Sequence, residues 1–292
     1  MSEPRYPYVH VDVTPEMVDE TSALLFELGA EGVEERDQGT LAKGAESGKV
    51  TLVAAFPTRE DAEEAISQLE VELSPRYEEI VGDAWRDAWK EHYRPFAIAR
   101  TKDGRAVVVR PPWEAHDAKP GEHVLELEPG RAFGTGLHET TRLVAQALAD
   151  HVGELAGVTL LDVGCGSGVL ALIALAFGAP RAVAVDIDPE SIDVTRENAA
   201  RNAMTDRIDA STTAIEDVKL VSSFVVANIE ARILIPMAAE LSRHVTNGGL
   251  LLLSGILVPQ KDEVRAAYPD FELLGAPEMG EWTLLALRKR AA

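Results

Sequence analysis

A glycine-rich turn is the clearest candidate for ligand chemistry in this sequence. The segment LDVGCGSG (161–168) places Gly164, Gly166 and Gly168 between an apolar run typical of a buried strand and a run typical of a helix. Without side chains the turn would let the backbone approach a ligand closely, and the helix N-terminus would add partial positive charge. A dinucleotide-binding turn reads GxGxxG/A, and Val169 replaces its third small residue here. The turn predicts a nucleotide-like ligand, with a nicotinamide dinucleotide as the weaker alternative.

Polar side chains end two further predicted strands. Asp186 ends the strand AVAVDI, 22 residues after the first glycine of the turn. A carboxylate there would accept hydrogen bonds from ribose hydroxyls, and a cap or turn role is the alternative. Asp188 is expected to cap the helix that follows. Asn228 ends the strand in FVVANIEARIL (224–234), where its amide oxygen would accept from an amine unless it caps the next segment.

The segment PGRAFGTGLHETTR (129–142) has the glycine and threonine content of a loop that wraps a ligand. It lacks the Gly-Lys-Ser/Thr of a triphosphate-binding loop. A zinc motif HExxH would need histidine at position 142, which is Arg142, so we expect His138 to be a hydrogen-bonded structural histidine. The single cysteine, Cys165, excludes an internal disulfide and any multi-cysteine metal site, and we expect it to be a small packing residue. No metal site is predicted.

Four short apolar runs predict a parallel β-sheet. They are VTLLDVG, AVAVDI, FVVANI and GLLLLSG, and helical patterns separate them. Continuous apolar strands are buried on both faces, which requires helices on each side of the sheet. The segment FELLGAPEMGEWTLLALRKR (271–290) predicts two strands joined by a turn. The sequence therefore predicts an α/β domain whose parallel sheet ends in an antiparallel pair.

The first 75 residues predict a small α+β unit. Its strand patterns lie at 8–13, 31–36 and 49–56, and its helix patterns at 15–28 and after the cap residue Thr58. The order βαββα favours a ferredoxin-like half.

An aromatic helix is predicted to follow this unit at 82–96. Trp85, Trp89 and Tyr93 recur every four residues and form a ridge on one helical face, and Pro95 ends the helix. The ridge either packs between two domains or contacts a substrate.

The composition is that of an acidic globular protein. Of its 292 residues, 46% are apolar and 26% charged, and the chain is long enough for two domains. Its longest apolar stretch is shorter than the roughly 20 residues of a membrane helix, and no secretory signal pattern begins it, so we expect a cytoplasmic protein. The net charge of −21 disfavours nucleic acid as a partner and suits either solubility or a basic protein substrate. Residues 1–75 hold 17 Asp and Glu against 5 Lys and Arg, a net charge of −12.

With its GxGxG turn, Asp186 and terminal strand pair, the second part of the chain resembles the Rossmann-like class I methyltransferases, which use S-adenosylmethionine. Within that fold, four segments resemble the methyltransferases that act on large-subunit ribosomal protein eleven: AFGTGLHETT (132–141), ANIEARIL, LSGIL and GEW. The FGTG-x-H-x-TT loop is specific to that family, whereas GxGxG is not. Position 139, often proline in relatives, is glutamate here, which removes no hydrogen-bond donor.

The resemblance covers nearly the whole chain and implies its domain organisation. A ferredoxin-like substrate-recognition domain would occupy residues 1–76, and the aromatic linker helix residues 77–96. The methyltransferase domain, with a seven-stranded and mostly parallel sheet, would occupy residues 97–292.

The resemblance also implies a set of site residues. Thr141 would bond the methionine end of the cofactor, Phe133 would form part of its wall, and Gly134 would let the covering loop move. The remaining cofactor contacts, carried over by position, are Gly164, Gly166, Gly168, Asp186 and Asn228. Trp85 and Trp89 are the candidates for substrate recognition.

The function implied is transfer of methyl groups from S-adenosylmethionine to lysine and N-terminal amines of ribosomal protein eleven. The transfer would be an in-line displacement by a monomeric enzyme, with Asn228 as the candidate contact of the acceptor amine. Carboxylates in the pocket would raise the pKa of an acceptor lysine, so we expect acidic residues to steer the substrate from outside the pocket. One alternative is an enzyme of the same fold acting on another protein lysine or a small amine. A non-catalytic binding module is disfavoured by the intact glycine turn and Asp186.

Overall fold

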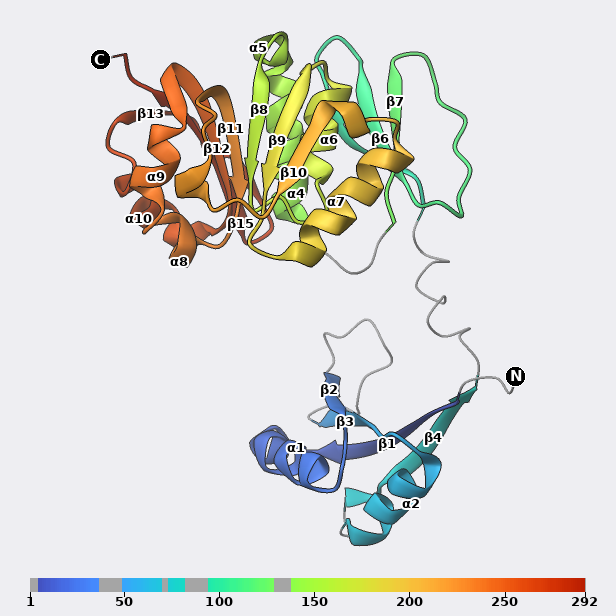
Figure 1. Cartoon of the computed structure of the whole chain (residues 1–292). Coiled ribbons are helices and arrows are strands. Elements are labelled where there is room, and N and C mark those ends of the chain that lie inside the picture. Colours follow the sequence, from blue (N-terminus) through green and yellow to red (C-terminus); the bar gives the residue numbers. More distant parts are fainter. Residues whose placement is uncertain (1–4, 37–48, 70–72, 82–93, 129–137, 292) are drawn as a thin grey trace. The chain divides into compact units, whose positions relative to one another are not determined.

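The computed structural model describes residues 5–36, 49–69, 73–81, 94–128 and 138–291. The chain divides into two compact units between His92 and Tyr93, and Figure 1 shows both. Most of the predicted aromatic helix, at 82–93, lies outside the described residues. Within the described segments, every helix is too short or too polar to cross a bilayer.

The first unit is a four-stranded antiparallel sheet with two helices. The strands are β1 (Arg5–Val13), β2 (Gly32–Arg36), β3 (Val50–Ala55) and β4 (Arg76–Val81), and the helices are α1 (Val18–Glu27), which the 3-10 turn η1 (Pro15–Met17) precedes, and α2 (Arg59–Gln68). The strands lie in the order β2-β3-β1-β4. Burial alternates along β1, as its period-two pattern predicts.

Two details of the first unit bear on the predictions. The side chain of Thr58 accepts a hydrogen bond from the backbone N–H of Asp61 at 3.2 Å, which confirms it as the cap of α2. The predicted boundary at residue 76 is wrong, because 76–81 form β4, which pairs with β1. The sequence pattern missed β4 because the charged run RYEEIV lacks the apolar alternation of a half-buried strand.

The second unit contains a small sheet that the sequence analysis did not anticipate. It consists of β5 (Phe96–Arg100), β6 (Ala106–Arg110) and β7 (Glu122–Glu126). The pairing is antiparallel between β5 and β6 and parallel between β6 and β7. Its buried residues join the hydrophobic core on one side of the larger sheet.

The larger sheet has eight strands, five of them parallel. The strands are β8 (Thr159–Val163), β9 (Arg181–Val185), β10 (Ile208–Ser211), β11 (Ser222–Asn228), β12 (Val245–Leu257), β13 (Phe271–Gly275), β14 (Glu278–Met279) and β15 (Trp282–Lys289). Their order is β10-β9-β8-β11-β12-β15-β13, and β14 pairs with β15 off this path. The last strand of the chain, β15, lies antiparallel between β12 and β13. The predicted antiparallel end is confirmed. The two-residue β14 in its turn makes eight strands in place of the predicted seven.

Helices cover both faces of the larger sheet, as the continuous apolar runs predict. They are α4 (Glu139–Asp150), α5 (Val152–Leu155), α6 (Val169–Ala176), α7 (Pro189–Arg201), α8 (Ala231–Leu234), α9 (Ala238–Arg243) and α10 (Lys261–Ala266), with 3-10 turns η4 (Thr205–Arg207), η5 (Ile215–Asp217) and η6 (Val258–Gln260). Successive residues of β11 alternate between the two cores: Phe224 faces the core of α4, α6 and α7, and Val225 that of α8, α9 and α10. Figure 1 shows the two groups of helices around the strands.

One carboxyl group is buried inside the first of these cores. Asp162, in β8, has no exposed surface, and its Oδ2 accepts a hydrogen bond from the backbone N–H of Ala171 in α6 at 3.1 Å. Its Oδ1 has no partner among the described residues. Burial raises the pKa of Asp162 to about 7; the nearby Asp186 charge also raises it, and the Ala171 N–H opposes the shift.

Replacement of Asp162 by Asn should reduce the pH dependence of stability. The folded protein holds the Asp162 proton more tightly than the unfolded chain, so this contribution is fully present below pH 3.8 and is lost as the pH rises through about 7. Over that range the difference in unfolding free energy between wild type and Asp162→Asn should change by up to about 4 kcal/mol, at 1.36 kcal/mol per pKa unit. Urea unfolding of both proteins at pH 5 and pH 8 measures the part of this change that falls between pH 5 and 7, about 2.7 kcal/mol for two pKa units. Equal pH dependence of the two proteins would contradict this assignment.

Candidate active site

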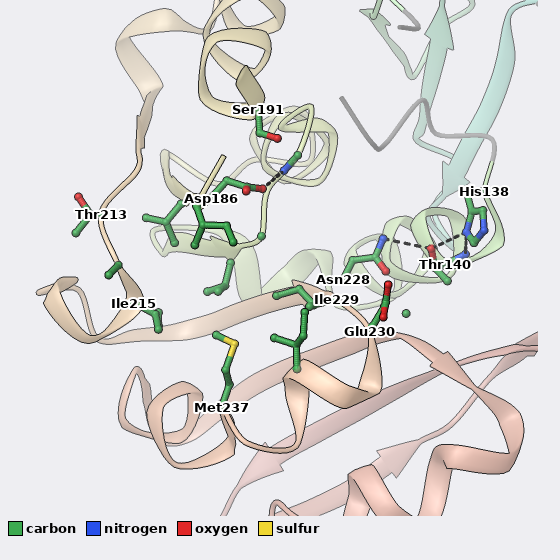
Figure 2. Close-up of a pocket in the computed structure, with 18 of the residues that line it drawn as sticks. His138, Thr140, Asp186, Ser191, Thr213, Ile215, Asn228, Ile229, Glu230 and Met237 are labelled. Atoms are coloured by element: carbon green, nitrogen blue, oxygen red, sulfur yellow. Dashed lines mark hydrogen bonds between the residues drawn. The ribbon is translucent and has the colours of Figure 1, made fainter. Parts of the chain in front are cut away.

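A single edge of the larger sheet gathers the predicted polar residues. Since β8, β9 and β11 run parallel, their carboxyl ends meet there. The strand order reverses between β8 and β11, and crevices for ligands form at such switch points. A cavity of about 460 Å³ opens at this place (Figure 2). Gly164, Gly166, Asp186 and Asn228 all line it.

The glycine turn lies tightly against the end of β9. The backbone N–H groups of Gly164 and Cys165 both donate to the carbonyl of Val185, at 2.8 and 3.1 Å. Gly164 has φ +69°, and a Cβ there would lie 2.8 Å from the Ile229 side chain, so a larger residue would displace the wall of the cavity. Gly168 does not line the cavity: it precedes α6 with φ +74°, and its missing Cβ leaves room for Thr195.

The carboxylate of Asp186 is oriented by backbone N–H groups. Its Oδ2 accepts from Gly166 at 2.9 Å, and its Oδ1 accepts from Asp188 at 3.0 Å. A carboxylate has about four lone-pair positions, so both oxygens keep the capacity to accept from a ligand's hydroxyls. Asp188 itself caps α7 by accepting from the backbone of Glu190, as predicted. Asp186 therefore also has the turn role that was the alternative prediction. Its two hydrogen bonds to backbone N–H groups fix the carboxylate at the cavity.

Asn228 does not cap the segment after it, because the N-cap of α8 is Glu230. Its Nδ2 donates to the hydroxyl of Thr140 at 3.3 Å, which joins the end of β11 to the first turn of α4. Of the two adjacent threonines, Thr140 lines the cavity and Thr141 does not. The sequence indicates that one of the two threonines lies in the site. Which of them faces the cavity depends on how α4 packs, and the sequence does not show this.

Thr141 is buried beside the cavity. Its side chain is 1% exposed, and its hydroxyl oxygen is without a partner among the described residues. A buried polar atom without a partner is costly, and a ligand group or water is a common remedy. Thr141 thus fits a role in holding a polar ligand end, although it does not line the cavity in the described structure.

Apolar side chains form the rest of the cavity wall. Ile187 follows Asp186 directly and is 92% exposed, which is unusual for an isoleucine. Ile215, Ile229, Ile233 and Met237 contribute from the segments after β10 and β11. An apolar slot beside a carboxylate suits a ligand with a flat ring attached to a sugar. Sequence reasoning missed these residues; an isoleucine directly after a strand-ending acid was the available signal.

Other cavity residues arrive from distant parts of the chain. Trp282 begins β15 and meets His138 edge to face, with ring centroids 5.2 Å apart. Gly255, in a bulge of β12, has φ +81° and lies where a Cβ would be 2.6 Å from the Ile229 carbonyl oxygen. No local pattern links these positions to the glycine turn, so sequence reasoning did not assign them to the site.

One expectation about charge is wrong. Glu230 lines the cavity, although we expected acidic residues to steer the substrate from outside the pocket. Its side chain is 62% exposed and pairs with the guanidinium of Arg232. The exposure and the pairing both weaken the electric field of Glu230. The expectation that a carboxylate in the pocket would raise the pKa of an acceptor lysine applies to a buried and unpaired carboxylate.

Four of the predicted site residues lie outside the described part of the chain. They are Phe133, Gly134, Trp85 and Trp89. Cys165 is described and is 6% exposed, and burial raises the pKa of its thiol, which keeps it protonated. His138 is hydrogen-bonded as expected: its ring caps α4 by accepting from the Thr140 N–H.

Comparison with known proteins assigns the chain. The family model described as "Ribosomal protein L11 methyltransferase (PrmA)" matches residues 5–290. A ribosomal protein L11 methyltransferase of Sorangium cellulosum (strain So ce56) is 56% identical over 270 residues, which is 91% of this chain and 84% of that protein. The enzyme of the same description from Geobacter metallireducens is 37% identical over 300 residues, covering 95% of this chain and 96% of its own.

A solved structure agrees with these relatives. The crystal structure of a ribosomal protein L11 methylase from Lactobacillus delbrueckii subsp. bulgaricus is 30% identical, with a TM-score of 0.61 over 68% of this chain and 100% of that one. The mixed α/β sheet is that of a class I methyltransferase. The chain therefore belongs to the ribosomal protein L11 methyltransferase family of S-adenosylmethionine-dependent enzymes.

Proposed function

We propose that this enzyme transfers methyl groups from S-adenosylmethionine to lysine side-chain and N-terminal amines of ribosomal protein L11. The observation that carries the proposal is the cavity that unites the glycine turn, Asp186 and Asn228 at one sheet edge. Family membership supplies the substrate.

The cofactor contacts follow from the cavity. Asp186 accepts from the ribose hydroxyls, and the turn at Gly164 and Gly166 brings the backbone close to the ligand. Ile187 and Ile215 flank the flat base, and Thr141, whose hydroxyl has no partner among the described residues, holds the methionine end. Phe133 and Gly134 belong to the covering loop in this proposal, on the basis of the family motif. Gly168 acts indirectly, by closing the turn onto α7.

The enzyme's main task in this reaction is alignment. The cofactor supplies a sulfonium whose methyl group is already activated toward displacement. Holding two reactants in line contributes up to ~7–11 kcal/mol. Deprotonating a lysine of pKa ~10.4 at pH 7 costs about 4.6 kcal/mol, at 1.36 kcal/mol per unit. Alignment is the larger quantity, so a dedicated strong base is not required.

Asn228 and Glu230 divide the handling of the acceptor. The Asn228 oxygen accepts from an N–H of the neutral amine and directs its lone pair toward the methyl group. Glu230 is exposed and its ion pair with Arg232 is weak at the surface, so it can exchange this partner for the charged lysine that approaches the cavity. The two polar residues therefore serve successive stages of substrate entry.

The first unit recognises the substrate in this proposal. Its sheet order β2-β3-β1-β4 and its two helices favour the ferredoxin-like assignment. The charge of −12 in residues 1–75 attracts a basic protein, and Trp85 and Trp89 are the candidates for further substrate contacts. We further propose that the enzyme works as a cytoplasmic monomer without binding nucleic acid, in keeping with its net charge of −21.

Incubation of the purified chain with S-adenosylmethionine and ribosomal protein L11 should produce a ladder of added methyl groups in the substrate's intact mass. Peptide mapping then assigns the modified amines. An unmodified substrate, with cofactor binding confirmed in the same preparation, would contradict the proposed substrate.

Replacement of Asp186 by Ala should weaken S-adenosylmethionine binding by more than about tenfold, because two hydrogen bonds to a charged group are lost. Isothermal titration calorimetry measures the affinity. Asp188→Asn is the matched control, since asparagine caps α7 equally well and should leave the affinity unchanged. Unchanged affinity in Asp186→Ala would remove this residue from the site.

Deletion of residues 1–92 should abolish methylation of L11 and preserve cofactor binding. The cut falls between the two compact units, so both sheets of the second unit keep all their strands. Mass spectrometry of L11 and calorimetry with the cofactor are the two readouts. Methylation at the full-length rate would show that the first unit is not needed for recognition.

A further inference from the structure

A chain of hydrogen bonds links Asn228 to His138 through Thr140. The Nδ2 of Asn228 lies 3.3 Å from the Thr140 hydroxyl, and that hydroxyl lies 2.8 Å from Nδ1 of His138. The backbone N–H of Thr140 also donates to Nδ1, at 3.3 Å. Figure 2 shows the three side chains in line at the edge of the cavity.

The direction of each hydrogen bond follows from the chemistry of the groups. A backbone N–H can only donate, so Nδ1 of His138 carries a lone pair and the proton of the neutral ring is on Nε2. The Thr140 hydroxyl must then donate its hydrogen to Nδ1. Its oxygen has only lone pairs left for Asn228, so the amide group facing it is the NH₂.

This series of hydrogen bonds decides which atom Asn228 offers to the substrate. With its NH₂ held by Thr140, the amide presents its oxygen as the remaining hydrogen-bonding group. If the Thr140 hydroxyl were free to turn, it could donate to the amide oxygen instead, and the amide could rotate to present its NH₂. The Asn228 NH₂ would then face an N–H of the acceptor amine, and two donors cannot form a hydrogen bond. The lone pair of the amine would lose its orientation.

Further contacts hold Thr140 and His138, two of the three members of this series of hydrogen bonds. The Ser254 hydroxyl donates to the Thr140 carbonyl at 3.2 Å, and Trp282 packs against the His138 ring. Histidine is not among the residues preferred as a helix N-cap, whereas serine, threonine, aspartate and asparagine are. Its place at the cap of α4 is explained if the ring must also accept the hydrogen bond that the Thr140 hydroxyl donates.

We propose that His138 is a positioning residue for methyl transfer. Acting through Thr140, it fixes the Asn228 amide with its oxygen toward the acceptor amine. The inference rests on the proposed function, because it requires Asn228 to receive that amine.

A double-mutant cycle tests the proposal in the full-length enzyme. His138→Ala and Thr140→Val should each lower kcat toward L11 by about tenfold, while the Kd of S-adenosylmethionine changes by less than about twofold. The double variant should match Thr140→Val alone within about twofold, because both changes break the same chain. Independent contributions would multiply to about a hundredfold loss, and that result would overturn the proposal.

A conservative variant separates positioning from helix capping. In His138→Asn the amide oxygen can accept from both Thr140 groups, so kcat should recover most of the loss seen in His138→Ala. Thermal melting of each variant records the capping contribution. Equal kcat in the Asn and Ala variants, with the Asn variant fully folded, would overturn the proposal.

Nitrogen-15 NMR of the His138 ring gives a readout independent of L11. The expected tautomer carries its proton on Nε2 and none on Nδ1. A proton on Nδ1 at neutral pH would overturn the proposal. Failure of the wild-type enzyme to methylate L11 would instead contradict the proposed function, and the ring tautomer would still decide the direction of the hydrogen bonds.

Discussion

The site depends on one contact, the packing of the glycine turn against the end of β9. Two N–H groups of the turn share the Val185 carbonyl, and a third, from Gly166, binds the Asp186 carboxylate. The absence of a side chain at Gly164 also lets Ile229, just after β11, lie against the turn. Three neighbouring strand ends are thereby held together, and with them the acid, the amide and the backbone groups that face the cavity.

The contact connects the sheet to catalysis through rigid elements. The strands behind the cavity are buried on both faces, so their ends have little freedom to move. From Asn228 the hydrogen bonds continue through Thr140 to His138 at the start of α4. Such a frame suits the alignment mechanism proposed above, because small displacements of an acceptor amine would reduce the rate steeply.

Local patterns in the sequence were sufficient for the turn, Asp186 and the caps Thr58 and Asp188, since each is defined by a few adjacent residues. The parallel sheet and its antiparallel end followed from continuous apolar runs. Short or charged strands such as β4 and β10 carried too little periodicity to be recognised. Trp282, Gly255 and Glu230 reach the cavity only through the tertiary fold, and the choice of Thr140 over Thr141 depends on how α4 packs.

A crystal structure of the enzyme with S-adenosylhomocysteine bound would test the central claim most directly. We expect the ribose hydroxyls within hydrogen-bond distance of the Asp186 carboxylate, and the Asn228 amide beside the sulfur from which the methyl group leaves. A cofactor bound elsewhere, or one whose ribose does not contact Asp186, would contradict this account of the site.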